Sequence, residues 1–154
     1  PNLFGDNDNY HELNSHVIAS LIRKIKNANK NKIKSIVIWG DGTPKREFMH
    51  VDDLVINSIK ILQISKRAYW KNFKFSDSHL NIGSGYEISI INLAKMICKI
   101  LNYFPIIKLD KTMPNGVKRK IMSNAKVKKI LKSYKSYNNQ IFYKKLQNIV
   151  KNYN

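Results

Sequence analysis

The apolar positions of this chain recur with two different spacings, and each spacing predicts one kind of secondary structure. Between residues 18 and 25 they fall at i, i+3, i+4 and i+7, which predicts an amphipathic helix after a cap at Asn14 or Ser15. We interpret the polar Lys/Asn run 27–34 as the solvated end of this helix and a loop. The same spacing predicts further helices after a cap at Ser89 and over residues 124–132 and 140–151.

Short runs of apolar, mostly β-branched residues predict strands at 35–39, 80–82 and 106–109. A glycine- and proline-rich turn at 40–44 separates the first strand from an alternating, extended segment at 46–51. Because strands alternate with helices and no flexible linker interrupts them, the pattern predicts one domain of mixed α/β class.

A further helix is expected directly after the extended segment, because apolar residues recur at helical spacing from Val55 to Leu62. Asp52 or Asp53 is the expected cap of this helix. Residues 66–78 are polar with scattered aromatics, and we interpret them as a connection.

Composition narrows the class of protein. The chain has 154 residues with 28 Lys+Arg against 10 Asp+Glu, a net charge of +18, and 43% apolar residues, enough to bury a core. Only four of the basic residues are arginine, so we interpret the charge as a lysine-rich solvated surface and expect no nucleic-acid partner. Such a surface would also suit a phosphate-bearing small ligand.

Other function classes are disfavoured by what the sequence lacks. The one cysteine, Cys98, cannot form an internal disulfide and is expected to fill the core. No apolar run approaches a membrane span, so we expect no membrane partner and a cytoplasmic location. The four histidines lack metal-ligand spacing, and no metal is expected.

One cluster with possible chemistry is the segment from Trp39 to Leu54, which reads WGDGTPKREFMHVDDL. Trp39 could stack on a base or sugar, and the guanidinium of Arg46 could bind a diphosphate, while the glycines between them allow close approach. The alternative is structural: Trp39 lies in the core and Arg46 pairs with the aspartates 52–53.

The second cluster, from Asn2 to Val17, places His16 at a predicted helix N-terminus. The positive end of the helix dipole favours a neutral imidazole that can exchange a proton. The alternative is that His16 is a surface residue of the cap. The chain carries neither a Gly-x-Gly-x-x-Gly fingerprint nor a Tyr-x-x-x-Lys pair, so it has no self-contained dinucleotide site.

In this order and spacing, the two clusters resemble the C-terminal half of the GDP-L-fucose synthases, a family of extended short-chain dehydrogenases/reductases. The resemblance rests on WGDGTPKREFMHVDDL, on NLFG followed by DN and NSHV, on SHLNIGSGYEISI, and on KTMPNGVKRK. It runs from Pro1 to about Met122. It therefore implies a substrate-binding region over 1–122, truncated at its N-terminus, and a lysine-rich helical tail over 123–154.

The implied fold is an α/β substrate-binding lobe whose segments 80–82 and 48–51 join a Rossmann sheet that this chain lacks. We expect the chain to be a fragment, because it begins at Pro1 inside a motif. A fragment of this kind would leave those two edges exposed and would be prone to association.

The resemblance also implies roles for individual residues. Asn2 and Leu3 lie against the nicotinamide end of NADP, beside His16, which is the acid of the epimerisation. The family's substrate contacts fall on five positions: Lys24, Trp39, Arg46, Asn115 and Lys120. Three positions depart from the family pattern, which usually has Asp, Pro and Asp there: Asn115, Lys118 and Ser123.

The activity implied is NADPH-dependent 3,5-epimerisation and 4-keto reduction of GDP-4-keto-6-deoxy-D-mannose. NADP(H) would be bound mostly by the missing half, the full-length enzyme would be a homodimer, and the fragment would be inactive alone. Two alternatives remain open. The parent could be another nucleotide-sugar epimerase or reductase, or the chain could be a non-catalytic basic remnant that binds nucleic acid or protein.

Overall fold

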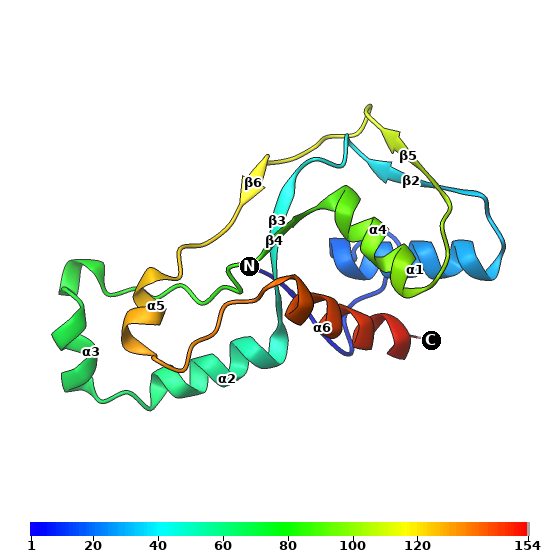
Figure 1. Cartoon of the computed structure of the whole chain (residues 1–154). Helices are drawn as coiled ribbons and strands as arrows, with labels where there is room; N and C mark the ends of the chain where they lie inside the picture. Colours follow the sequence, from blue (N-terminus) through cyan, green and yellow to red (C-terminus); the bar gives the residue numbers. More distant parts are fainter. Residues whose placement is uncertain (154) are drawn as a thin grey trace.

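A computed structural model describes residues 1–153 and shows short strands in two sheets, packed against helices (Figure 1). The larger sheet is built around β3 (Lys45–His50). Its neighbours are parallel β1 (Asn2–Phe4), antiparallel β4 (Glu87–Ser89) and parallel β6 (Arg119–Lys120). The register places Asn2 opposite Phe48 and Arg46 opposite Lys120.

The smaller sheet pairs β2 (Ser35–Trp39) with β5 (Ile106–Asp110) in parallel, so that Trp39 lies opposite Asp110. Parallel neighbours need a long crossover. Here the crossover contains the larger sheet's strands β3 and β4 together with four helices: α2 (Val51–Leu62), α3 (Lys66–Asn72), the short 3₁₀ turn η1 (Phe75–Asp77) and α4 (Ile90–Ile100).

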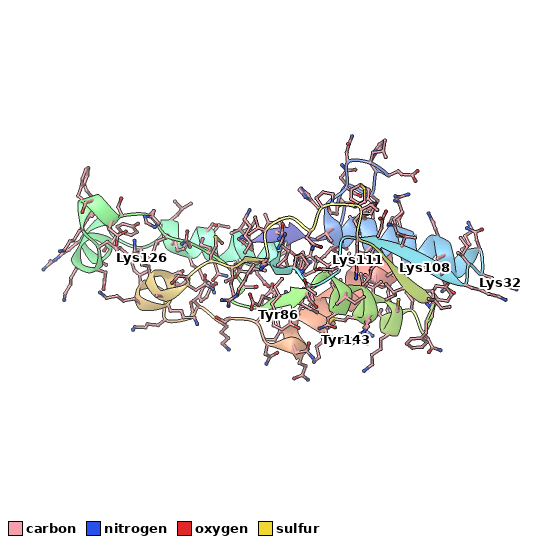
Figure 2. All side chains as sticks on the ribbon, turned by 90° about the horizontal axis from the view of Figure 1, so that it is seen from above. Lys32, Tyr86, Lys108, Lys111, Lys126 and Tyr143 are labelled. Atoms are coloured by element: carbon pink, nitrogen blue, oxygen red, sulfur yellow. The ribbon has the colours of Figure 1, made fainter. Side chains whose placement is uncertain are left out.

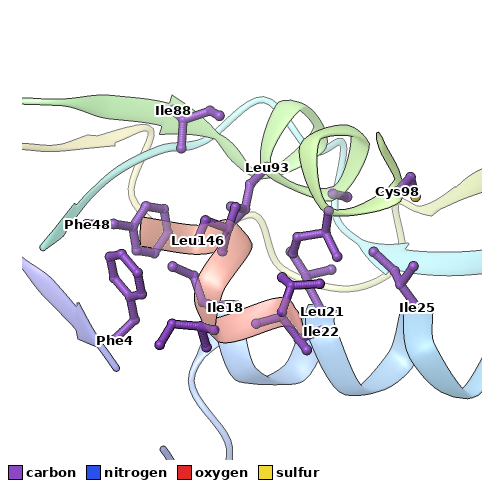
Figure 3. Packing of buried hydrophobic residues seen from close by; sticks show 14 of the residues in the cluster. Phe4, Ile18, Leu21, Ile22, Ile25, Phe48, Ile88, Leu93, Cys98 and Leu146 are labelled. Carbon is purple, nitrogen blue, oxygen red and sulfur yellow. The ribbon is translucent and has the colours of Figure 1, made fainter. Parts of the chain in front are cut away.

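Three amphipathic helices form one hydrophobic core with residues of both sheets (Figure 3). They are α1 (Val17–Lys30), α4 and α6 (Asn139–Asn152). Phe4 from β1 packs edge-on against Phe142 of α6, and Phe48 from β3 stacks on the same ring. Because α6 supplies core residues, the predicted tail packs on the same core as the rest of the chain, and the division at residue 122 stays a prediction.

A second group of helices extends away from this core (Figure 1). It consists of α2, α3 and α5 (Ala125–Ile130), and we call it the arm. No residue of α2 is buried, although the helix carries Val55, Ile59 and Leu62, the last 83% exposed. Its apolar side chains Val55, Ile59 and Leu62 are therefore left about half exposed or more.

Most predicted elements are confirmed, including both strands of the smaller sheet and the helix capped by Ser89, whose Oγ accepts from the amide of Asn92 at 3.3 Å. Cys98 is buried in the core as expected. Among residues 1–153, no helix is long and apolar enough to cross a membrane.

Several local predictions are wrong. The cap of α1 is His16, not Asn14 or Ser15, whereas the end of the helix at Lys30, inside the polar run 27–34, is as predicted. The cap of α2 is His50, whose Nδ1 accepts from the Asp52 amide, while both aspartates lie in the first turn. There a carboxylate interacts favourably with the helix dipole without accepting the capping bond.

The strand predicted at 80–82 does not form, because no neighbouring strand pairs with it in the described chain. In contrast β1, β4 and part of the 66–78 connection are regular structure that the pattern missed. The stretch 48–51, expected as an exposed edge, begins with buried Phe48 and Met49, because β1 pairs with β3 and the C-terminal segment covers it.

Candidate functional site

Trp39 ends β2 with its ring in solvent, 63% exposed. The side chain forms one wall of a groove of about 450 Å³, and the other walls come from α1, the segment before it and the start of α4. The lining includes Leu13, Val17, Leu21, Lys24 and Ile90. The interpretation of Trp39 as a core residue is therefore wrong. An exposed indole beside an open groove is available for stacking.

Lys24 lies in the same groove, so the structure brings two of the predicted substrate contacts together. Its Nζ donates to the carbonyl oxygen of Val37 at 2.8 Å, which fixes the ammonium beside β2. Partial burial, and secondarily the neighbouring Arg23, lower the pKa of Lys24 from its usual range.

Arg46 and Lys120 form a second pair, opposite each other on parallel strands β3 and β6. Arg46 does not pair with the aspartates 52–53. Its Nη1 donates instead to the carbonyl oxygens of Val117 at 2.5 Å and Lys45 at 2.9 Å. Its Nε and Nη2 have no protein acceptor in the described chain, so that a guanidinium held in place keeps donors for an anion.

The loop 114–118 joins these two pairs. Asn115 accepts from the Asp41 amide at 2.7 Å and donates Nδ2 to the Asp41 carboxylate at 3.0 Å. The neighbouring Gly116 leaves room for Arg46, because a Cβ there would lie 3.2 Å from Nη2. The loop thus contacts both the turn after Trp39 and the guanidinium.

The turn itself is stabilised by Asp41, whose Oδ1 accepts from the amide of Thr43 at 2.9 Å and from its hydroxyl at 2.7 Å. These bonds, led by the hydroxyl of Thr43, lower the pKa of Asp41, and Asn115 adds to the effect. Gly40 has a φ of +72°, and a side chain there would collide with Asn115. We call the contact between Asp41, Thr43 and Asn115 the turn latch.

The residues expected at the cofactor are more dispersed. Asn2 is turned inward, with Nδ2 donating to the carbonyl oxygen of Glu47 at 3.2 Å. Leu3 is partly exposed on β1, and His16 is exposed at the start of α1. Among the described residues no hydrogen bond joins these three side chains, so their shared role at the cofactor stays a prediction.

Glu47 has a structural role that sequence reasoning missed. Its carboxylate is 1% exposed and accepts from the amides of Gly85 at 2.7 Å and Met122 at 3.0 Å. A buried carboxylate is tolerated when such bonds satisfy it. The bond to Met122 holds the strand that carries Lys120 beside Arg46. The sequence carried no clear signal for this role, because Glu47 follows the charged residues Lys45 and Arg46.

The comparisons with known proteins agree with this architecture. The NAD dependent epimerase/dehydratase family matches residues 1–83. Over 121 residues the chain is 38% identical to GDP-L-fucose synthase of Escherichia coli, covering 79% of this chain and 38% of the relative. It is also 38% identical to GDP-L-fucose synthase 1 of Arabidopsis thaliana, covering 82% of this chain and 36% of the relative. The chain therefore spans little more than a third of the length of these relatives.

Among solved structures, a GDP-L-fucose synthetase of Naegleria fowleri bound to NADP superposes with a TM-score of 0.77 at 24% identity. The match covers 97% of this chain and 43% of the other, so the likeness is one of fold. The match to the family over more than half of the chain, together with the sequence relatives, shows that the chain is a GDP-L-fucose synthase-like member of the NAD dependent epimerase/dehydratase family.

Proposed function

We propose that this chain is the lobe that binds the nucleotide sugar in a GDP-L-fucose synthase, which epimerises and reduces GDP-4-keto-6-deoxy-D-mannose with NADPH. The sequence relatives and the motifs shared with that family support the proposal. The single observation that carries it is the positioned guanidinium of Arg46, with donors free and Lys120 opposite, joined by one loop to the turn that follows the exposed Trp39.

Each residue has a task that follows from its chemistry. Arg46 and Lys120 neutralise the diphosphate, and a planar guanidinium matches the spacing of phosphate oxygens. Trp39 stacks on the nucleoside and Lys24 donates to it from across the groove. Binding energy from this nucleotide locates the sugar, which is remote from these contacts.

His16 is the proposed acid of the epimerisation. Inversion at a carbon beside a ketone passes through an enolate-like state, which needs a base on one face and an acid on the other. His16 is exposed at the N-terminus of α1, where its imidazole is accessible to a bound sugar. NADPH would supply the hydride for the keto group, and Asn2, Leu3 and His16 are the residues of this chain that would lie beside it.

Titration of the chain with GDP tests the nucleotide site without requiring catalysis. We expect measurable but weak binding by isothermal titration calorimetry, and about tenfold weaker binding for Arg46→Ala, because a charge-assisted hydrogen bond contributes about 1.5–3 kcal/mol.

Arg67→Ala is the matched control. It removes the same charge from an exposed position of α3 in the arm. Unchanged affinity in Arg46→Ala, or an equal loss in both variants, would contradict the proposed site.

A further inference from the structure

A second groove, of about 480 Å³, follows the outer edge of β4 between α4 and α6. β4 is the last strand of its sheet, so this edge has no neighbouring strand. Among the residues that line the groove are Lys45, Tyr86, Glu87, Lys95, Lys99 and Tyr143. Tyr86 of the segment before β4 and Tyr143 of α6 both line it, and Figure 2 labels these two side chains. Small-molecule sites have volumes of about this size.

The charges in this groove are not balanced. Glu87 is the one acid in its lining, and Arg119 already engages that carboxylate at 2.7 Å, with Lys45 at 3.8 Å. Lys95 and Lys99 make no ion pair among the described residues. They are four positions apart on α4, where like charges face each other and destabilise the helix. An anion between them would remove that repulsion.

Neutral hydrogen-bonding groups complete the walls. The hydroxyl of Tyr86 donates to Oδ1 of Asn139 at 2.8 Å, which ties β4 to the start of α6. Burial raises the pKa of Tyr86, so the ring stays uncharged beside an anion. Asn92 also lines the groove and adds a side-chain amide between Ser89 and Lys95.

We propose that this groove binds a small ligand through a diphosphate group, with Lys95 and Lys99 as its principal contacts and Lys45 at the edge. Lysine is suited to this task as a compact charge with three donors. The site is separate from the proposed nucleotide site, because consecutive residues of an extended strand point to opposite faces and Lys45 therefore leaves β3 away from Arg46. The proposal does not depend on the proposed function.

Pyrophosphate is the probe, titrated by calorimetry at an ionic strength of about 0.15 M, where charges beyond about 8 Å are screened. We expect binding to the unmodified chain and about tenfold weaker binding to the double variant Lys95→Gln/Lys99→Gln. The control double variant Lys128→Gln/Lys129→Gln removes the same charge from exposed positions of α5 and should bind within about twofold of the unmodified chain. Pyrophosphate would also bind at Arg46 and Lys120 if that site takes a diphosphate, so the comparison of the two double variants is repeated in an Arg46→Ala background, where the loss caused by Lys95→Gln/Lys99→Gln should remain.

Amide chemical shifts provide a second measurement that does not depend on the variants. On addition of pyrophosphate, the amides of Asn92 and Lys95 should shift while that of Lys128 stays in place. Equal losses of affinity in both double variants would assign binding to the overall charge of the chain and overturn the proposal. The absence of chemical-shift changes in the groove would also overturn it. Titrations with GDP and with a single-stranded oligonucleotide show whether the groove prefers the diphosphate of a small nucleotide or the phosphates of a nucleic acid. Tighter binding of the oligonucleotide than of pyrophosphate, lost equally in both double variants, would instead indicate a general nucleic-acid surface.

Discussion

At the scale of single residues, side chains far apart in sequence support one another around the proposed nucleotide site. Asn115 was expected to contact substrate, yet both of its side-chain hydrogen bonds go to Asp41. Whether it also contacts a ligand stays a prediction. Its observed role is to hold the turn that follows Trp39, so at this position the structure assigns a contact that no motif specifies.

Asn115→Ala should therefore weaken GDP binding with little loss of global stability. The latch bonds are exposed, and each contributes about 1 kcal/mol or less to unfolding free energy. The fluorescence of Trp39, isolated in a Trp70→Phe background, should report a more mobile ring. The control is Asn29→Ala, at an exposed position in the last turn of α1 and outside the turn latch. Native fluorescence and native GDP affinity in Asn115→Ala would argue against a positioning role for the latch.

At the scale of elements, strong local patterns were predicted well and weak ones were not. Helices α1, α4 and α6 have continuous apolar stripes, so their existence and their buried faces follow from the sequence. Strands β1 and β4 have three residues each, too short for a period-2 pattern to be visible. The segment 80–82 has a strand-like composition, but a strand also requires a neighbour, which composition does not specify.

Leu146→Ala tests whether α6 belongs to the same cooperative unit as the rest of the core. Leu146 is fully buried, and we expect a loss of about 3 kcal/mol in unfolding free energy from urea denaturation, in a single transition. Gln147→Ala, next to it on the same helix, should change this free energy by less than about 0.5 kcal/mol. A first transition that involves α6 alone would show instead that the C-terminal helix is a separate unit.

At the scale of the whole molecule, the arm stands apart because it extends away from the hydrophobic core. Helix α2 exposes Val55, Ile56 and Ile59, each about half exposed, along one side. Monomers seldom leave so continuous an apolar surface uncovered. The expected association of the chain therefore rests on this helix, since the stretch 48–51 turned out to be covered.

We expect the chain to self-associate with rising concentration in sedimentation velocity experiments. The double variant Ile56→Glu/Ile59→Glu should shift the distribution towards the monomer, because both side chains are exposed on the stripe. Val117→Glu is the control, at an exposed apolar residue of the loop 114–118 outside the arm. A chain that stays monomeric at all concentrations would exclude association through α2.

The sequence by itself determined the α/β class, the three helices of the core, the smaller sheet's strands and the family, because those depend on local periodicity and on motifs read in order. Only the tertiary structure decided that Trp39 lies in solvent, that Lys120 lies opposite Arg46, and that buried Glu47 holds their strands together. These outcomes depend on which distant segments become neighbours. Burial and pairing are properties of that arrangement, and no single stretch of residues contains them.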